Sequence, residues 1–367
     1  MERLTLEQVI AGIVPADADA IHRATERQGQ LTKPPGSLGR LESLSIQLAG
    51  IFGTERPSPK GKTVIVAAGD HGVVAQGITG YPQEVTAQMV LNFLGGGAAV
   101  SVMARKADVK LVIVDAGVAS GLPDHPALKV VGTGKGTADI SVGPAMTREQ
   151  AELCVNAGIG FALDAAEAGS DIIGTGDMGI GNTTASSAIV AALTGRSPLE
   201  TTGRGTGRNV EEMKHKTEVV ERALMVNQPD RSDGLDVLSK VGGFEIGVLA
   251  GVILGGAYAK RVVVVDGFIS GAAALIAGSL CPHVYDYVIA SHRSAEKGHK
   301  LALAHMKLKP VLDLGMRLGE GTGGVLAMGI VEAAATCLSD MATFAEAGVS
   351  DREPEGAESE GVVEGAR

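Results

Sequence analysis

Residues 171–184, with the sequence DIIGTGDMGIGNTT, have the composition of an anion-binding turn. A short apolar run is followed by four glycines within eight residues, and Asn182, Thr183 and Thr184 then begin an alanine-rich helical stretch. Glycines let a backbone approach a ligand closely, and the N-terminus of a helix presents free N–H groups and a favourable dipole. We therefore expect a phosphate group to bind here.

The glycines at 174, 176 and 179 also match the GxGxxG pattern of dinucleotide sites. Such a site needs an acidic residue at the end of a strand about twenty residues further on, and no strand is predicted before Glu200. No lysine follows the glycines, which excludes a Walker loop. A mononucleotide phosphate fits better, and a turn that only packs a helix against a sheet is the alternative.

Cations follow this stretch in an otherwise acidic protein. Residues 203–208 read GRGTGR, and the helix predicted behind them carries Lys214 and Lys216. Lysine can bind phosphate as a point charge. The alternative is an exposed basic helix face.

Two carboxylates are candidates for acid–base chemistry. Glu320 lies between glycines in residues 317–324, RLGEGTGG, and Asp177 lies in the glycine-rich stretch. A glutamate there could cap the following helix, but burial in an apolar cleft would raise its pKa and suit a general base. His71 and His292 lack metal spacing and no GxSxG elbow is present, so we expect neither a metal site nor a hydrolase triad.

Short β-branched runs that alternate with helical segments should position these groups. The predicted strands are residues 64–66, 111–114, 172–173, 262–265 and 284–289, with 128–131 a weaker candidate. Such alternation predicts a parallel sheet with helices on both faces, and ligands bind at the carboxyl ends of its strands. The polar residues expected along that edge are Asp70, His71, Asp115, Asp177, Asp266 and Ser291.

Helical patterns fill most of the remaining chain. They cover residues 1–30, broken by Pro15, and 42–50, 84–107, 148–168, 210–226, 235–259 and 322–341. Residues 31–40 contain two prolines and two glycines and predict an ordered loop. Residues 350–367 are acidic and poor in core-forming residues, which predicts a disordered tail.

The composition favours small-molecule chemistry. A net charge of −10 and only 3% aromatic residues argue against a nucleic-acid surface. The charged N-terminus does not resemble a signal peptide, and the apolar run at 246–259 is too short to span a membrane. Three scattered cysteines predict reduced core thiols, so we expect a cytoplasmic protein with no membrane or nucleic-acid partner.

Ten segments, in order over residues 31 to about 345, carry a family resemblance. They are TKPPGSLGRLE (32–42), AGDHGV (68–73), PQEVT (82–86), NFLGGGA (92–98), DMGIGNTT (177–184), GRGTG (203–207), VGGFEIG (241–247), DGFIS (266–270), SHRS (291–294) and LGEGTG (318–323). Together they resemble the nicotinate-nucleotide:dimethylbenzimidazole phosphoribosyltransferases of cobalamin biosynthesis.

The resemblance implies transfer of 5-phosphoribose from nicotinate mononucleotide to 5,6-dimethylbenzimidazole, giving α-ribazole 5′-phosphate and nicotinate, without a cofactor or metal. It implies a homodimer with a Rossmann-like α/β domain at residues 61–300. A smaller helical domain would come from both chain ends, residues 1–60 and 301–349. The alternatives are a related transferase that uses adenine or phenolic acceptors, and a non-catalytic sensor that binds a base or its riboside.

The resemblance also assigns site residues. Glu320 would be the catalytic base, and Asp177 stands where family members carry Glu, which keeps the charge but shortens its reach. The 5′-phosphate would bind Gly179, Gly181, Asn182, Thr183 and Thr184, with Gly205 and Lys216. The substrate-binding residues around the aromatic base and the ribose would be Tyr81, Gln88, Met178, Leu318 and Ser294.

Overall fold

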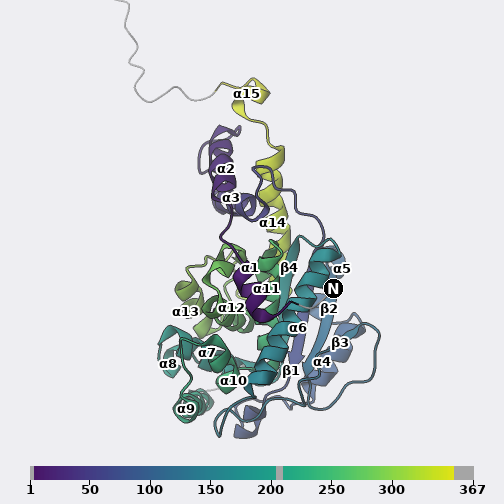
Figure 1. Ribbon diagram of the computed structural model, residues 1–367, viewed down its shortest axis with the longest axis vertical. Coiled ribbons are helices and arrows are strands. Elements are labelled where there is room, and N and C mark those ends of the chain that lie inside the picture. The colour runs from purple at the N-terminus through teal and green to yellow at the C-terminus, as the bar shows by residue number, and fades with distance from the viewer. Residues whose placement is uncertain (1–3, 204–209, 351–367) are drawn as a thin grey trace, which may run out of the picture.

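The computed structural model describes residues 4–203 and 210–350 (Figure 1). Its strands are β1 (Lys62–Gly69), β2 (Lys110–Gly117), β3 (Leu128–Val130), β4 (Ile172–Met178), β5 (Val262–Val265) and β6 (Val288–Ala290). Its helices are α1 (Leu6–Gly12), α2 (Ala18–Gln30), α3 (Arg40–Phe52), α4 (Val85–Leu94), α5 (Ala99–Lys106), α6 (Arg148–Glu167), α7 (Asn182–Thr194), α8 (Pro198–Thr201), α9 (Val210–Asn227), α10 (Gly234–Val241), α11 (Phe244–Tyr258), α12 (Phe268–Leu280), α13 (Lys297–Met306), α14 (Thr322–Asp340) and α15 (Phe344–Ala347), with 3₁₀ turns η1 (Gly72–Gln76) and η2 (Pro282–Asp286).

The six strands form one parallel sheet in the order β3-β2-β1-β4-β5-β6. The predicted Rossmann-like α/β class is therefore confirmed. The strand order reverses direction between β1 and β4, and in doubly wound sheets ligands bind in the crevice beyond the carboxyl ends at that point. The end of β1, at Gly69, and the end of β4, at Met178, consequently frame the expected site.

Helices cover the sheet on both faces. As a consequence, β1 from Thr63 onward and all of β5 are buried. In one group, α6, α11 and α12 pack together, and α11 lies against β1, β2, β4 and β5. In a second group, α5 lies against β2 and α14 against β1, β4 and β5. Buried alanine and glycine in α11 let α6 approach closely, and a side chain at Gly158 or Gly251 would overlap the backbone of the neighbouring helix.

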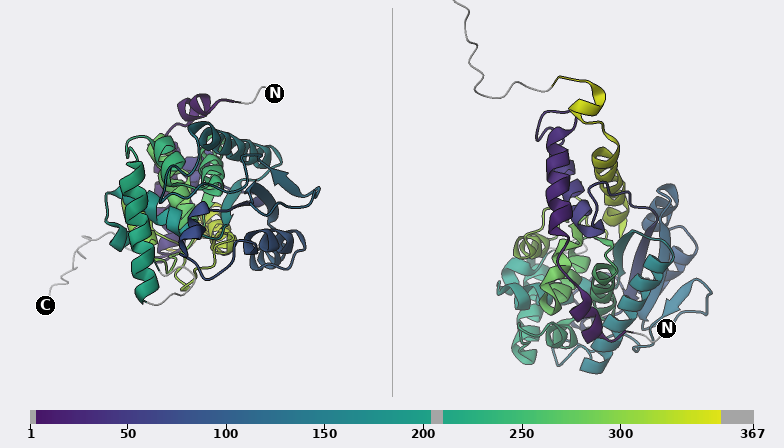
Figure 2. Two further views of the ribbon diagram at one scale, coloured as in Figure 1. Left: turned by 90° about the horizontal axis from the view of Figure 1, so that it is seen from below. Right: turned by 45° about the horizontal axis from the view of Figure 1, so that its top comes forward.

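A small helical unit is built from both ends of the chain. Helices α2 and α3 pack against α14, and in Figures 1 and 2 this unit projects from the sheet body. The buried guanidinium of Arg27 donates to the carbonyl oxygens of Leu338 and Met341, which joins α2 to the end of α14. The predicted boundaries at residues 60 and 300 stay predictions, although residue 300 lies inside α13.

Two predicted long helices are each broken at consecutive glycines. The helix predicted over residues 84–107 is two helices, α4 and α5, separated at residues 95–97, and the helix predicted over 235–259 is α10 and α11, separated at 242–243. Glycine costs more backbone entropy in a helix than any other residue except proline, and successive glycines favour a break. Each break creates a new helix N-terminus.

Two local predictions were also wrong. The first half of the apolar run at 284–289 belongs to η2, and β6 spans only Val288–Ala290. The turn expected from Gly174 onward begins only at Gly179, because β4 continues to Met178. A side chain at Gly174 would contact Met328, and one at Gly176 would overlap the carbonyl oxygen of Glu320, so these glycines serve close packing under α14.

Other expectations differ in detail or lie outside the described residues. Cys154 and Cys281 are buried, whereas Cys337 is only partly buried. The stretches Val85–Lys106 and Thr322–Asp340 are long and apolar enough to cross a membrane by length and composition alone. The first is interrupted by glycines, and the second packs on α3 and the sheet. The acidic tail at 351–367 lies outside the described residues.

Candidate active site

Glu320 lies in a tight loop directly before α14. Gly319, Glu320 and Gly321 have φ angles of +83°, +64° and +92°, so three successive residues adopt the left-handed conformation. Glycine adopts it without cost, but a glutamate there is strained by about 1–3 kcal/mol. The Glu320 N–H donates to the carbonyl oxygen of Asp177 at 3.2 Å, which ties the loop to the end of β4.

The Glu320 carboxylate accepts a hydrogen bond from the Val100 N–H at 3.3 Å. Val100 lies in the first turn of α5, where backbone N–H groups have no partner within the helix and the dipole favours a negative charge. Glu320 is 5% exposed, and burial raises its pKa despite the Val100 hydrogen bond. The sequence prediction missed this contact because it expected residue 100 inside one continuous helix.

Asp177 lies beside this loop at the end of β4. One carboxylate oxygen accepts from the Asn182 side chain at 3.0 Å, and the other is buried with no hydrogen-bond partner among the described residues. Burial raises the pKa of Asp177 well above its ordinary value, and the charges of Asp266, Glu245 and Glu320 add to this. Asp177 therefore binds a proton more tightly than an exposed aspartate does.

The turn after β4 holds the N-terminus of α7 close to the end of β1. A side chain at Gly179 would overlap the carbonyl oxygen of Gly69, and one at Gly181, where φ is +99°, would lie 2.9 Å from Val74. The N–H groups of Ile180, Asn182 and Thr184 already donate to Thr86 Oγ1, Gly179 and Gly181. A phosphate at this turn would therefore use the remaining N–H groups.

Lys216 reaches the same turn from α9. Its side chain is buried, and Nζ donates to Thr183 Oγ1 at 2.7 Å. The structure thus brings the predicted cation to the first turn of α7, which the sequence alone could not distinguish from an exposed basic face. Lys214 on the same helix is 81% exposed and lies 3.9 Å from Glu218. Gly205 lies outside the described residues.

The residues predicted around the aromatic base and the ribose differ in their exposure. Tyr81, Gln88 and Leu318 are exposed, and Met178 is partly buried. Ser294 is buried, and its Oγ accepts from the Glu296 N–H at 3.3 Å. A side chain built on Gly267 would lie 3.8 Å from the Ser294 Cβ, so Ser294 lies beyond the end of β5.

A buried ion pair that the sequence did not predict, His71 with Glu245, lies against the turn after β4. His71 Nε2 lies 2.7 Å from Glu245 Oε1, and both side chains are buried. Burial alone would lower the pKa of His71, but the charge and hydrogen bond of Glu245 raise it. Glu245 reaches His71 because α11 begins at Phe244, after the break at residues 242–243.

The geometry brings the N-terminus of α7, the buried Lys216 at its first turn, and the carboxylates of Asp177 and Glu320 to the end of β4, where the strand order of the sheet reverses. Residues 13–349 match a family model described as phosphoribosyltransferase. The fold and the site thus define an enzyme that transfers a phosphoribosyl group. More specifically, the chain belongs to the nicotinate-nucleotide–dimethylbenzimidazole phosphoribosyltransferase family.

Relatives and solved structures with that name cover nearly the whole chain. The nicotinate-nucleotide–dimethylbenzimidazole phosphoribosyltransferase of Roseiflexus sp. (strain RS-1) is 57% identical over 347 residues, 95% of this chain and 98% of its own. That of Dehalococcoides mccartyi (strain CBDB1) is 49% identical over 348 residues, with coverage of 95% and 99%. The crystal structure of the enzyme from Thermus thermophilus has a TM-score of 0.88 at 46% identity, over 92% of this chain and 100% of that one.

Proposed function

We propose that this enzyme transfers 5-phosphoribose from nicotinate mononucleotide to 5,6-dimethylbenzimidazole, releasing nicotinate and forming α-ribazole 5′-phosphate. The observation that carries the mechanism is the buried Glu320 carboxylate, held by the first turn of α5 beside Asp177. A base is needed because the benzimidazole must lose its N–H proton as it bonds to C1′ of the ribose. Nicotinate leaves a cationic pyridinium as a neutral pyridine and needs little acid assistance.

In this scheme Glu320 accepts the acceptor's proton, and its negative charge also stabilises the oxocarbenium-like ribosyl centre. Burial raises its pKa toward the working pH, which increases its strength as a base. Asp177, with its raised pKa, is proposed to remain protonated and to avoid placing a second negative charge beside Glu320.

The 5′-phosphate is proposed to bind at the N-terminus of α7 with Lys216. The support is the position of the buried Lys216 ammonium at Thr183, in the first turn of that helix. Free N–H groups, the helix dipole and a lysine charge together favour a dianionic guest. Gly205 and Ser294 remain proposed contacts, and Tyr81, Gln88, Met178 and Leu318 remain the proposed lining for the aromatic base.

The decisive experiment mixes the protein with nicotinate mononucleotide and a panel of bases, and measures free nicotinate and the riboside phosphate by chromatography. We expect nicotinate release with 5,6-dimethylbenzimidazole and formation of the α-riboside phosphate. A preference for adenine or a phenol would indicate the related transferase. Binding without nicotinate release from any mixture would indicate the non-catalytic sensor.

The enzyme is further proposed to act as a homodimer. Leu91 on α4, Val102 on α5 and Leu326 on α14 are 46%, 44% and 41% exposed, and a cavity of about 450 Å³ between α5 and α14 is lined largely by apolar side chains. Apolar surface of this kind favours burial by a partner. Light scattering should give a dimer mass, and Leu326→Glu should shift it toward the monomer.

We propose a cytoplasmic enzyme with small-molecule substrates and no nucleic-acid or membrane partner. The net charge of −10 and the scattered cysteines support this proposal.

A further inference from the structure

Helix α14 begins without a cap from its own residues. Its N-cap is Gly321, which has no side chain, and the first turn continues with Thr322, Gly323 and Gly324. The first N–H groups of a helix have no partner within it, and burying them unpaired costs about 1–3 kcal/mol each. Since Glu320 immediately precedes the N-cap, the partner of these N–H groups also sets the position of Glu320.

That partner comes from another part of the chain. Asp266, directly after β5, accepts from the Gly321 N–H through Oδ2 at 3.1 Å and from the Gly324 N–H through Oδ1 at 2.9 Å. One carboxylate thus binds both ends of the first turn of α14. Asp266 is completely buried, and burial raises its pKa to about 7, against the lowering effect of the hydrogen bonds from the backbone N–H groups of Gly321 and Gly324.

The surroundings of Asp266 hold it in this orientation. Its own N–H donates to Thr175 Oγ1 at 3.3 Å, and its carbonyl oxygen accepts from Ser291 Oγ at 2.9 Å. Because the Ser291 hydroxyl has one proton, the 3.0 Å contact with His292 Nδ1 requires that His292 donates. His292 is therefore protonated at Nδ1, which also lies 3.7 Å from Asp266 Oδ1.

The other titratable groups around Asp266, among the described residues, include no strong cation. Burial lowers the pKa of His292, and burial and His292 lower the pKa of His299 to about 3, so both rings are neutral. Asp177 is the neighbouring carboxyl, and the charge of Asp266 helps to raise the pKa of Asp177. The ionised form of Asp266 is therefore stabilised chiefly by the backbone N–H groups at the start of α14.

The left-handed conformation of Glu320 gives this contact a catalytic consequence. A strained residue keeps its conformation only when its neighbours restrain it. The loop is held on one side by the hydrogen bond from Glu320 N–H to Asp177, and on the other by Asp266 through Gly321. Without Asp266, relaxation of the loop would move the Glu320 carboxylate away from Val100 and from the crevice.

We propose that Asp266 is a positioning residue for the phosphoribosyl transfer: by capping α14 from the end of β5, it holds the Glu320 carboxylate in place for proton abstraction. Asp266 contacts no substrate in this scheme and acts through Glu320. The inference rests on the proposed role of Glu320 as the base.

The test is Asp266→Asn, which keeps the shape of the side chain but turns one of its two acceptors into a donor. Whichever way the amide is oriented, an NH₂ group faces either Gly321 or Gly324. We expect kcat to fall by about 100-fold, as for a catalytic group displaced by about 1 Å. Binding of nicotinate mononucleotide, measured by calorimetry, should not change, because the α7 site is separate.

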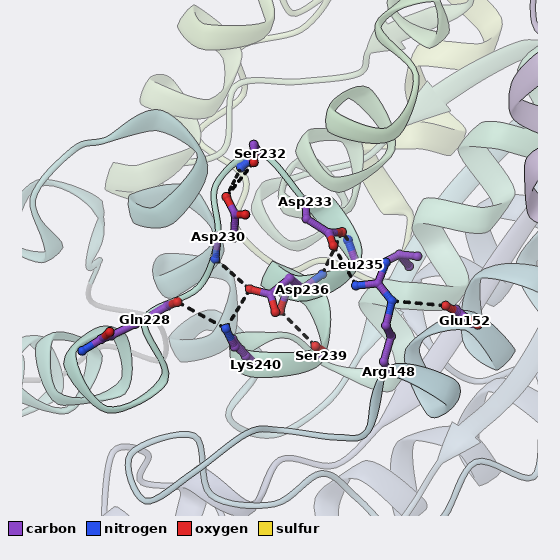
Figure 3. A network of polar contacts seen from close by, with 10 residues as sticks. All are labelled: Arg148, Glu152, Gln228, Asp230, Ser232, Asp233, Leu235, Asp236, Ser239 and Lys240. Atoms are coloured by element: carbon purple, nitrogen blue, oxygen red, sulfur yellow. Dashed lines mark hydrogen bonds and ion pairs between the residues drawn. The ribbon is translucent and has the colours of Figure 1, made fainter.

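Asp233→Asn is the matched control. Asp233 caps α10 by accepting from the N–H groups of Leu235 and Asp236 at 3.0 and 3.1 Å, and it also binds Arg148 (Figure 3). The same substitution there should lower the melting temperature without a loss of kcat. If the two variants show equal kcat, Asp266 has no positioning role.

Two further variants separate possible failures. In Asp266→Asn/Glu320→Gln, kcat should be no lower than in Glu320→Gln alone, because both changes act through one base. Multiplied losses would mean that Asp266 acts independently of Glu320, which overturns the inference. Full activity of Glu320→Gln alone would instead refute the proposed base.

A change of acceptor gives a readout that a general loss of structure would not produce. A nitro-substituted benzimidazole has a more acidic N–H and depends less on a base. The loss of kcat in Asp266→Asn should therefore shrink with this acceptor, in parallel with Glu320→Gln, and an equal loss with both acceptors would contradict the inference.

Gly323→Ala keeps the proposal testable if Asp266→Asn does not fold. A Cβ on Gly323 would overlap the His292 ring and would lie 2.8 Å from Asp266 Oδ1, so it would displace the carboxylate together with the neighbouring imidazole without removing either group. The same selective loss of kcat is expected, and unchanged kcat would count against the cap.

Discussion

Replacement of Glu320 by glutamine tests the proposed base most directly. Glutamine has the same shape, and its side-chain oxygen can still accept from the Val100 N–H, so the strained loop should be retained. The variant loses only the negative charge and the ability to take a proton. Burial of Glu320, which is 5% exposed, makes it difficult for bulk water to replace the carboxylate.

General-base catalysis contributes about 10²–10⁴-fold, or about 3–5 kcal/mol of transition-state stabilisation. The enclosed position of Glu320 places the expected loss of kcat toward the upper end of that range, at about 10³–10⁴-fold. The affinity for nicotinate mononucleotide should stay near that of the unmodified enzyme, since the proposed phosphate contacts lie at α7.

The assay follows nicotinate release under saturating substrates, and calorimetry measures nucleotide binding separately. Glu332→Gln is the control, because Glu332 lies on α14, the helix that follows Glu320, but forms a partly exposed ion pair with Lys62 at 2.8 Å. Its kcat should be unchanged. A Glu320→Gln enzyme that retains more than about a tenth of the original kcat would refute the assignment of Glu320 as the base.

Three further predictions concern the phosphate site and the buried charges. Lys216→Ala should raise KM for nicotinate mononucleotide more than KM for the base, whereas Lys214→Ala, at an exposed position, should change neither; equal effects in initial-rate kinetics would relocate the phosphate. His71→Gln removes the charge that compensates the buried Glu245 carboxylate, and it should lower the free energy of unfolding by about 3–5 kcal/mol in urea titrations. His22→Gln, at an exposed ion pair, should leave this free energy almost unchanged. Asp177 binds its proton more tightly in the folded than in the unfolded chain, so its stabilising effect is complete below its ordinary pKa of 3.8 and is lost as the pH rises through the raised value. As the pH rises from about 4, the stability of Asp177→Asn should therefore fall less than that of the unmodified enzyme. Parallel curves would show that the pKa of Asp177 is not raised.

The sequence predicted the class of fold because its signals are local. The β-branched runs at residues 64–66, 111–114 and 262–265 correspond to β1, β2 and β5, and the short run at 128–131 corresponds to β3. Alternation with helices then requires parallel strands with covered faces. The order of ten family-like segments identified the enzyme family without any coordinates.

Local patterns failed where a long-range contact or a break decided the outcome. The glycine spacing at Gly174 and Gly176 is typical of a turn. Both residues nevertheless belong to β4, because α14 and the Glu320 loop pack directly on them. The runs at 84–107 and 235–259 have continuous helical periodicity, and only their internal glycines, at 95–97 and 242–243, mark where each ends. Periodicity describes which face is buried, but it does not describe where the helix must stop to fit its neighbours.

The sequence by itself determined which groups are present: a glycine-rich helix start, Lys216, and the carboxylates of Asp177 and Glu320. The tertiary structure decided how they act. It placed the first turn of α5 at the Glu320 carboxylate, a contact between residues that are 220 positions apart in the chain. It also placed Asp266 at the first turn of α14, across 55 positions. Such contacts depend on the strand order of the sheet, which brings distant chain segments to one edge and cannot be read from spacing along the sequence.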